Sequence, residues 1–230
     1  MEALQQFHLQ RFHDRTEAGT KLAQQLLTYQ QDPLGLVLGL PRGGVPIASI
    51  IAQTLQLPLD ICLVRKLGLP GNPEVAMGAI ASGGVLWLNR ALITRLGISQ
   101  ETIATVTARE RQELQRRERV YRGDRPPLSV AGRHVILVDD GVATGATMLA
   151  AIQSLVSPAQ DPRSLANSAR SPARLVVAVP VAPQETYDTI ASQVDQIVCV
   201  LIPPNFHAIG LWYDNFEQIA DAEVCRLLQD

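Results

Sequence analysis

The chain has 230 residues, of which 47% are hydrophobic and 18% charged, and its formal net charge at pH 7 is −2. A chain of this size and composition can bury one sizeable core, which excludes a disordered or fibrous protein. The small net charge indicates no globally basic surface for nucleic acid, and every apolar run is far shorter than the roughly 18 residues of a membrane span.

The amino terminus and the cysteines bear on the compartment. The first residues interleave polar and charged side chains where a secretory signal needs a continuous apolar segment. The three cysteines lie far apart and predict neither a disulfide framework nor a CxxC metal pair. We therefore expect a cytoplasmic protein with reduced thiols.

Apolar segments alternate with amphipathic ones along most of the chain. Ala18, Leu22 and Leu26 at helical spacing predict an opening helix over 15–29. Continuous apolar runs then predict strands buried on both faces, with helices between them. The strands are expected at 34–40, 59–65, 133–140, 174–181 and 196–203, and the helices at 44–56, 146–156 and 183–193. This order predicts an α/β fold, a doubly wound parallel sheet.

Three segments interrupt this rhythm. Residues 76–89 alternate like an antiparallel hairpin at a sheet edge, with the turn at 82–84. Residues 99–119 form a charged helix capped by Ser99, whose arginines either make ion pairs on a solvated face or line a site for an anion or RNA. Residues 157–173 are rich in Ser, Pro and Ala, and we interpret them as a mobile surface insertion within one domain that spans 1–230.

The sequence VILVDDGVATGATM, residues 135–148, is the most informative segment. Its strand would deliver Asp139 and Asp140 to the carboxyl edge of the sheet, where ligands of open α/β sheets bind. Gly141 and Gly145 allow a tight loop, and backbone N–H groups with threonine hydroxyls at a helix start form an anion site. Two adjacent acids would repel a phosphate unless a diol or Mg²⁺ lay between them. The segment therefore predicts a sugar-phosphate site.

Other known motifs with similar residues match this segment less well. A Walker A loop needs GK[ST] and a dinucleotide loop needs GxGxxG, and neither is present. A receiver domain needs an acceptor aspartate at a later strand end, and the haloacid dehalogenase signature needs acids two positions apart, but position 141 is glycine. A purely structural origin of the acids is the remaining alternative, although adjacent buried carboxylates are unfavourable without a partner.

The segment resembles the motif by which type I phosphoribosyltransferases bind 5-phosphoribosyl 1-pyrophosphate (PRPP), except that Gly141 replaces an apolar residue. LPRGGVPIA (40–48) is similar to the pyrophosphate loop of this family, and VRKLGLP (64–70) to the strand end before the flexible loop of its adenine-type enzymes. Similarity to a group of predicted phosphoribosyltransferases extends to FHDRTEAG, NPEVAMGAIASGG and AIGLWYDNF, and so to almost the whole chain.

The resemblance implies a Mg²⁺-dependent homodimeric enzyme. It would transfer ribose 5-phosphate from PRPP to a small nitrogenous, planar heterocyclic acceptor and release pyrophosphate. It would also have a small hood, formed by about 76–125 and 203–230. Gly68, Pro70, Gly71 and Pro73 predict a flexible lid loop, which also contains Glu74. The alternative is a PRPP sensor without turnover that binds nucleic acid through the arginine-rich helix at 109–125.

The resemblance and the residue chemistry together assign roles in the site. Arg42, Arg65 and Lys66 would stabilise the leaving pyrophosphate, and these retained cations favour the enzyme over the sensor. Glu74 would act as a base toward the acceptor. Asp139 and Asp140 would hold the ribose diol and Mg²⁺. The residues expected to contact PRPP are Pro41, Arg42, Gly43, Gly44, Lys66, Asp139, Asp140, Gly141, Val142, Ala143, Thr144, Gly145, Ala146 and Thr147.

The acceptor wall is predicted from fewer signals. The expected acceptor contacts are Ala143, Phe206, Trp212 and Tyr213, the aromatic residues by stacking on a planar base. Ala143 stands where hypoxanthine-guanine enzymes carry an acid, which leads away from 6-oxopurines. Structural alternatives stay open, with the aromatic residues in the core and the cations and Glu74 at the surface. The resemblance also implies a cis bond between Pro41 and Arg42.

Overall fold

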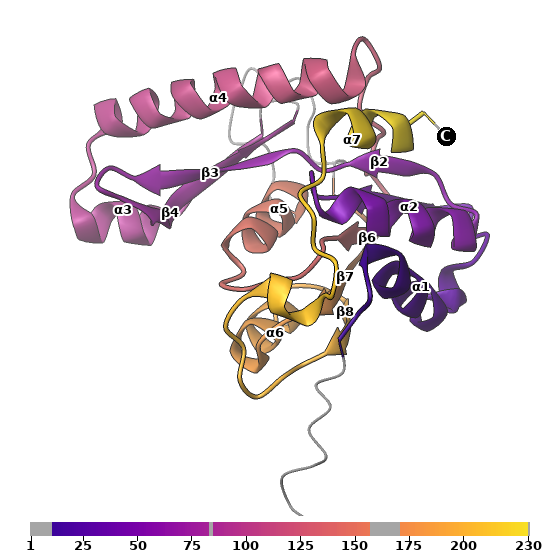
Figure 1. The fold of residues 1–230 in the computed structure, drawn as a ribbon. Helices are drawn as coiled ribbons and strands as arrows, with labels where there is room; N and C mark the ends of the chain where they lie inside the picture. The colour runs from indigo at the N-terminus through magenta and orange to yellow at the C-terminus, as the bar shows by residue number, and fades with distance from the viewer. Residues whose placement is uncertain (1–10, 83–84, 157–170, 230) are drawn as a thin grey trace, which may run out of the picture.

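The computed structural model describes residues 11–82, 85–156 and 171–229 (Figure 1). Residues 83–84 of the expected hairpin turn and residues 157–170 of the expected insertion lie outside the described residues. Within the described part of the chain, no helix is long and apolar enough to cross a membrane.

The described strands form a parallel sheet of five in the order β2-β1-β6-β7-β8 and a separate antiparallel sheet of three. The strands of the parallel sheet are β1 (Gly35–Gly39), β2 (Leu59–Ile61), β6 (His134–Val138), β7 (Arg174–Val181) and β8 (Gln196–Leu201). Every residue of β1 is buried, as expected for a strand covered on both faces. The predicted α/β fold with a parallel sheet is confirmed.

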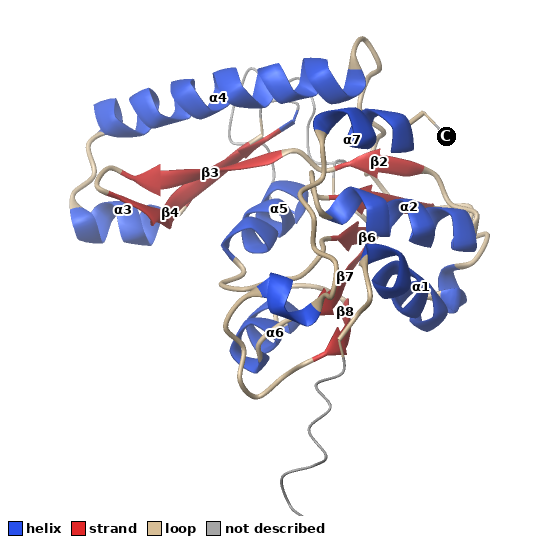
Figure 2. Cartoon of the chain, in the orientation of Figure 1, coloured by secondary structure: helices blue, strands red, loops and turns tan. Residues whose placement is uncertain are grey.

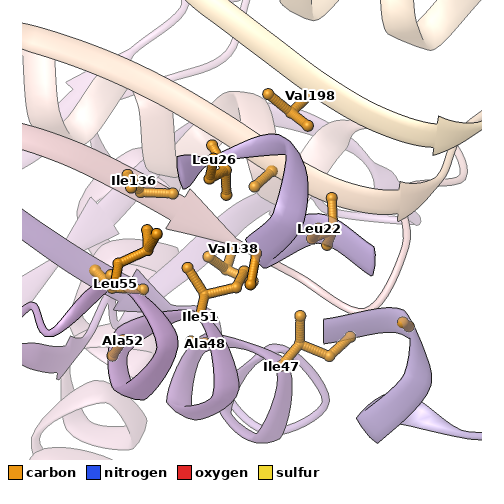
Figure 3. Packing of buried hydrophobic residues seen from close by; sticks show 14 of the residues in the cluster. Leu22, Leu26, Ile47, Ala48, Ile51, Ala52, Leu55, Ile136, Val138 and Val198 are labelled. Atoms are coloured by element: carbon orange, nitrogen blue, oxygen red, sulfur yellow. The ribbon is translucent and has the colours of Figure 1, made fainter. Parts of the chain in front are cut away.

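Helices cover both faces of this sheet (Figures 1 and 2). The helices α1 (Arg15–Gln25) and α2 (Gly44–Leu55) pack on one face, and α5 (Ala146–Val156) and α6 (Gln184–Ala191) lie on the other. Figure 3 shows side chains of α1 and α2, such as Leu22 and Ile51, packed toward Val138 of β6. The predicted opening helix ends earlier than expected and continues as a 3-10 turn, Leu27–Tyr29.

The second sheet consists of β3 (Val64–Leu69), β4 (Asn72–Ala81) and β5 (Leu86–Leu88). The helices α3 (Arg90–Leu96) and α4 (Gln100–Arg122) follow it, and α4 covers β3 (Figure 1). The expected pairing within 76–89 is confirmed, because β4 and β5 are antiparallel, but β4 is the centre of a separate sheet rather than an edge of the main one.

One expectation about this region is corrected and another stays a prediction. The apolar run 59–65 is not one strand, because β2 ends at Ile61 and β3 begins at Val64 in the other sheet. The expected lid loop lies at the hairpin turn between β3 and β4, where Leu69 pairs with Asn72 and Gly71 has φ +79°. Its movement stays a prediction.

The segment after β8 divides between two cores. A 3-10 turn, η3 (Ile209–Trp212), joins the core beneath α1, whereas α7 (Asp221–Leu227) places Val224 in the cluster between α4 and the second sheet. The range 203–230, from which a contribution to the hood was expected, thus contributes to both cores.

Candidate functional site

The strand order changes direction between β1 and β6, and the two predicted ligand loops follow these neighbouring strands. Gly39 pairs with Val138, and the N–H of Leu40 donates to the carbonyl of Val138 at 2.8 Å. The loop at 40–43 therefore begins beside Asp139. Such a reversal at the carboxyl edge is where open α/β sheets bind ligands. The bond between Pro41 and Arg42 is cis, as the family resemblance implies.

Glycines bring the two loops into contact. A Cβ atom on Gly43 would overlap the Oδ2 atom of Asp140. A Cβ on Gly44 would lie 2.5 Å from the carbonyl oxygen of Val138 and 2.8 Å from the Cα of Asp139. The structure thus brings together two motifs that are almost a hundred residues apart in the sequence.

The two carboxyl groups are electrostatically strained. The N–H of Asp140 donates to Oδ1 of Asp139 at 2.9 Å. Burial, followed by the neighbouring Asp140, raises the pKa of Asp139 well above its usual value. Burial also raises the pKa of Asp140, although Arg15 opposes this shift. Adjacent acids with raised pKa values favour a ligand that brings positive charge or hydroxyl donors.

Arg15 is a residue of this site that the sequence did not reveal. It begins α1, and its Nε and Nη2 atoms donate to Oδ2 of Asp140 at 3.0 and 2.7 Å. Its Nη1 donates to the carbonyl of Glu217 at 2.9 Å, and its guanidinium carbon lies 4.0 Å from the centre of the Phe216 ring. Arg15 therefore joins the acids to the segment after β8.

The predicted phosphate loop leads into α5. Val142 is buried and its N–H donates to the carbonyl of Val181, whereas Ala143, Thr144 and Thr147 are exposed. The hydroxyl of Thr186 donates to the carbonyl of Ala143 at 2.7 Å. The side chains of two threonines are thus open to solvent around the start of α5, where N–H groups and the helix dipole favour an anion.

Close packing explains why position 141 is a glycine. Its φ is +154°, and a Cβ atom there would lie 2.6 Å from Cγ2 of Ile209 and 3.1 Å from Cγ1 of Val181. The loop therefore passes close to η3, and the departure from the family pattern accommodates this contact. Gly145 has φ +77°, a conformation that favours glycine.

The Arg42 side chain is partly exposed to solvent and makes one long contact. Its Nη1 lies 3.8 Å from Oδ1 of Asp221, and the two side chains are 36% and 42% exposed. The hydroxyl of Tyr121 donates to the same Oδ1 at 2.7 Å. An exposed contact this long contributes little, so Arg42 can exchange Asp221 for a ligand phosphate.

Arg65 and Lys66 are not at the end of a core strand, which corrects the expectation. Both lie within β3 and pair with β4. Nε and Nη2 of Arg65 donate to Oε2 of Glu110 at 2.9 and 2.6 Å, and Glu110 is buried on α4. Arg65 thus joins the second sheet to α4. Glu74 belongs to β4, but its side chain lies outside what the structure describes.

The expected aromatic wall is also corrected. Trp212 is 6% and Tyr213 3% exposed, and both belong to the core beneath α1. The Tyr213 ring packs between Phe12 and Phe216, and its hydroxyl donates to the carbonyl of Asp140 at 2.7 Å. Neither ring has a free face for a base in this structure. Phe206 is partly buried against the same core.

Ion pairs account for several arginines of α4. Arg109 pairs with Glu110, and Arg116 and Arg117 pair with Glu113 at 2.8 Å each. The charged helix therefore fits the interpretation of a solvated, ion-paired face.

The acids at the sheet edge suit Mg²⁺ only together with a ligand. Among the described residues, no group of three or more His, Cys, Asp or Glu side chains could hold a metal by itself. Mg²⁺ commonly binds through one or two carboxylates plus substrate oxygens and water. Asp139 and Asp140 fit that mode.

Comparisons with known proteins agree with this geometry. Residues 8–160 match the family model described as "Phosphoribosyl transferase domain". In two strains of Mycobacterium tuberculosis, proteins named "Putative phosphoribosyl transferase" are 40% identical to this chain over 217 residues, which are 94% of this chain and 46% of each relative. This chain thus spans about half the length of these curated relatives.

A solved structure is also similar over nearly its full length. The crystal structure of TT1426 from Thermus thermophilus shares 39% identity and a TM-score of 0.82, and the match covers 95% of this chain and 97% of that one. The fold, the paired loops at the sheet edge and the family match agree, and the chain belongs to the phosphoribosyl transferase domain family.

Proposed function

We propose that the chain transfers ribose 5-phosphate from PRPP to a nitrogen nucleophile and releases pyrophosphate. The observation that carries this proposal is the contact of Gly43 and Gly44 with the acidic pair, Asp139 and Asp140. The loop after β1 and the acidic pair therefore meet at one sheet edge, and we assign pyrophosphate to the loop and the ribose diol to the acids.

Each part of PRPP has a matching group in the chain. The 5-phosphate would meet the start of α5, with the exposed hydroxyls of Thr144 and Thr147. The ribose diol would bind the carboxylates, of which Asp140 is held in place by Arg15. The pyrophosphate would meet Arg42 and the backbone after β1.

In the reaction, the bond from ribose C1 to the pyrophosphate oxygen breaks and its electron pair leaves with pyrophosphate. The lone pair of the acceptor nitrogen forms the new bond to C1, and the acceptor nitrogen gives up its proton to water. Arg42 stabilises charge that builds up on the leaving group, which lowers the barrier because the interaction strengthens in the transition state. Mg²⁺ bound at the acids would neutralise negative charge on PRPP.

The acceptor proposed is a planar, uncharged heterocycle other than guanine or hypoxanthine. Ala143 is exposed at the loop, and its side chain can neither donate nor accept a proton. Because Trp212 and Tyr213 are buried, stacking by these two rings is not part of the proposal.

Pyrophosphate release tests the proposal. The protein would be incubated with Mg²⁺, PRPP and a panel of nitrogenous heterocycles, and Asp139→Asn, which is expected to bind PRPP more weakly, would be the comparison. We expect acceptor-dependent release by the natural chain, without activity on guanine or hypoxanthine. PRPP binding without release on any acceptor would favour the sensor alternative, and absence of PRPP binding would overturn the proposal altogether.

A further inference from the structure

The last helix brings a carboxylate to the loop to which we assign pyrophosphate. Asp221 is the first residue of α7, and its Oδ1 atom lies 3.8 Å from Nη1 of Arg42. Arg42 belongs to the loop after β1, so this contact joins an early loop to a residue close to the end of the chain. A negative charge of the protein therefore lies beside the cation that the leaving pyrophosphate would use.

A buried tyrosine holds this carboxylate in place. Tyr121 lies near the end of α4 and is 4% exposed, and its hydroxyl donates to Oδ1 of Asp221 at 2.7 Å. Burial, followed by this hydrogen bond, raises the pKa of Tyr121 to about 12, so the hydroxyl keeps its proton at neutral pH. The same oxygen of Asp221 thus contacts both a buried donor and Arg42.

The backbone that carries Asp221 is attached to its neighbours. Figure 1 shows α7 between α4 and α2, and α7 contacts both helices. The Val224 side chain is buried in the cluster that includes residues of α4, and Sγ of Cys225 donates to the carbonyl of Val120 at 3.1 Å. Because these contacts fix α7, we expect Asp221 to give way to a ligand by rotation of its partly exposed side chain.

The contact between Asp221 and Arg42 is weak enough to be exchanged. It is long and open to solvent, so it contributes little to stability. Oxygens of a pyrophosphate can form shorter, charge-assisted hydrogen bonds to the guanidinium. The carboxylate nevertheless stays nearby, and like charges repel each other within the Debye length of about 8 Å at physiological ionic strength. Asp221 therefore opposes the binding of a multiply charged anion at Arg42.

We propose that Asp221 is a positioning residue for Arg42 and an internal competitor of pyrophosphate. In the ligand-free chain it gives Arg42 a partner, and during binding its carboxylate turns away from the guanidinium. After the transfer it regains Arg42, so the product pyrophosphate is held less tightly and leaves sooner. This inference rests on the proposed function only in that Arg42 binds the pyrophosphate group.

Calorimetric titration with inorganic pyrophosphate and Mg²⁺ tests the competition without an acceptor. Asp221→Asn keeps the shape of the side chain but removes its charge, and we expect this variant to bind pyrophosphate roughly 3- to 10-fold more tightly than the natural chain. A variant that merely disturbed the fold would bind more weakly. In 1 M salt, where the Debye length is about 3 Å, the ratio of the two affinities should fall toward one.

Two further substitutions locate the effect. Glu101→Gln removes the same charge from the start of α4, roughly 30 Å along the helix from Tyr121 at 1.5 Å per residue, and should leave the affinity unchanged. Arg42→Gln should weaken pyrophosphate binding. Adding Asp221→Asn to Arg42→Gln should then give a smaller gain than in the natural chain, because the contested cation is gone.

The results separate this inference from the proposed function. If the natural chain binds PRPP and pyrophosphate but Asp221→Asn binds pyrophosphate equally or more weakly, the inference alone is overturned. An equal gain with and without Arg42 would also overturn it, since Asp221 would then not act through that residue. If neither the natural chain nor Asp221→Asn binds PRPP or pyrophosphate, the proposed function and the inference both fail.

Discussion

Two buried arginine–aspartate pairs lie in different regions and are satisfied in different ways. Between the two sheets, Asp60 accepts on both oxygens from Arg122, and also from the N–H groups of Ile61 and Leu128 at 2.7 and 2.8 Å. At the sheet edge, Arg15 donates twice to a single oxygen of Asp140. The neighbouring Asp139 keeps a raised pKa because it is buried beside Asp140.

The contrast separates a structural ion pair from a site prepared for a ligand. A carboxylate whose two oxygens already accept hydrogen bonds from the protein has few acceptor sites left for a ligand. Two adjacent acids beside one arginine repel each other and lower the stability of the ligand-free protein. Binding of a diol and a cation relieves this repulsion. Loss of Arg122 should therefore affect stability, whereas changes around Asp139 should affect ligand binding.

The largest expected effect is on stability. Arg122→Met leaves the charge of Asp60 buried without its partner and should lower the free energy of unfolding by about 3–5 kcal/mol, measured by urea denaturation. Adding Asp60→Leu should recover only part of the loss, because two backbone N–H groups then lose their acceptor. If Arg122→Met lowers the free energy of unfolding by less than about 1 kcal/mol, the pair with Asp60 is not the structural ion pair described above.

Gly43→Ala is expected to have a smaller effect on stability and, in addition, to slow turnover. The added methyl group must displace the Asp140 carboxylate or the loop, so the free energy of unfolding should fall by about 1–3 kcal/mol. Turnover should fall on the order of 10²-fold, the effect of misplacing a reacting group by about 1 Å. Gly97→Ala is the control for turnover, since a Cβ there meets nothing within 4 Å and Gly97 ends α3, away from both loops. Its φ is +62°, unlike the −63° of Gly43, so this variant also loses some stability. Normal turnover by Gly43→Ala would show that the two loops are not coupled.

The acids should make the empty protein less stable as the pH rises. Because burial raises the pKa of Asp139 in the folded state, the folded chain binds more protons than the unfolded one above the usual pKa of 3.8, and the free energy of unfolding falls with rising pH. Asp139→Asn should flatten this dependence and stabilise the ligand-free chain at pH 7 by about 0.5–2 kcal/mol. Identical pH profiles for the two proteins would contradict this account.

The smallest effect is expected on the exposed face of α4. Hydrogen bonds from Arg116 and Arg117 lower the pKa of Glu113 to about 2. Its contribution should be present above the usual pKa of 4.5 and lost as the pH falls from there toward 2. Glu113→Gln should cost less than about 1 kcal/mol at pH 7, because solvent screens the pair. A loss above about 2 kcal/mol would show that this helix face is not merely solvated.

The sequence predicted the features that depend on local pattern. Buried strands are continuous apolar runs, so the parallel sheet and the strand before Asp139 could be recognised. The break between β2 and β3 could not, because Cys62 and Leu63 are apolar and continue the run while the chain passes from one sheet to the other.

Long-range contacts account for the rest of the site. Arg15 meets Asp140 across 125 positions, and Arg65 meets Glu110 across 45, distances at which one sequence shows no pattern. The sequence also did not decide whether Trp212 and Tyr213 are buried, since aromatic residues after a strand are found both in cores and in ligand sites. The glycines of the loop after β1 were recognisable, but only the structure shows that Gly43 is required by the carboxylate of Asp140.

The central claim is that the edge at Asp139 and Asp140 binds PRPP, and calorimetric titration with Mg²⁺ and PRPP tests it most directly. The natural chain should bind, and Asp139→Asn and Asp140→Asn should each weaken binding by about 1.5–3 kcal/mol, the contribution of a hydrogen bond to a charged group. Gly97→Ala should bind as the natural chain does. Unchanged affinity in both aspartate variants would contradict the account.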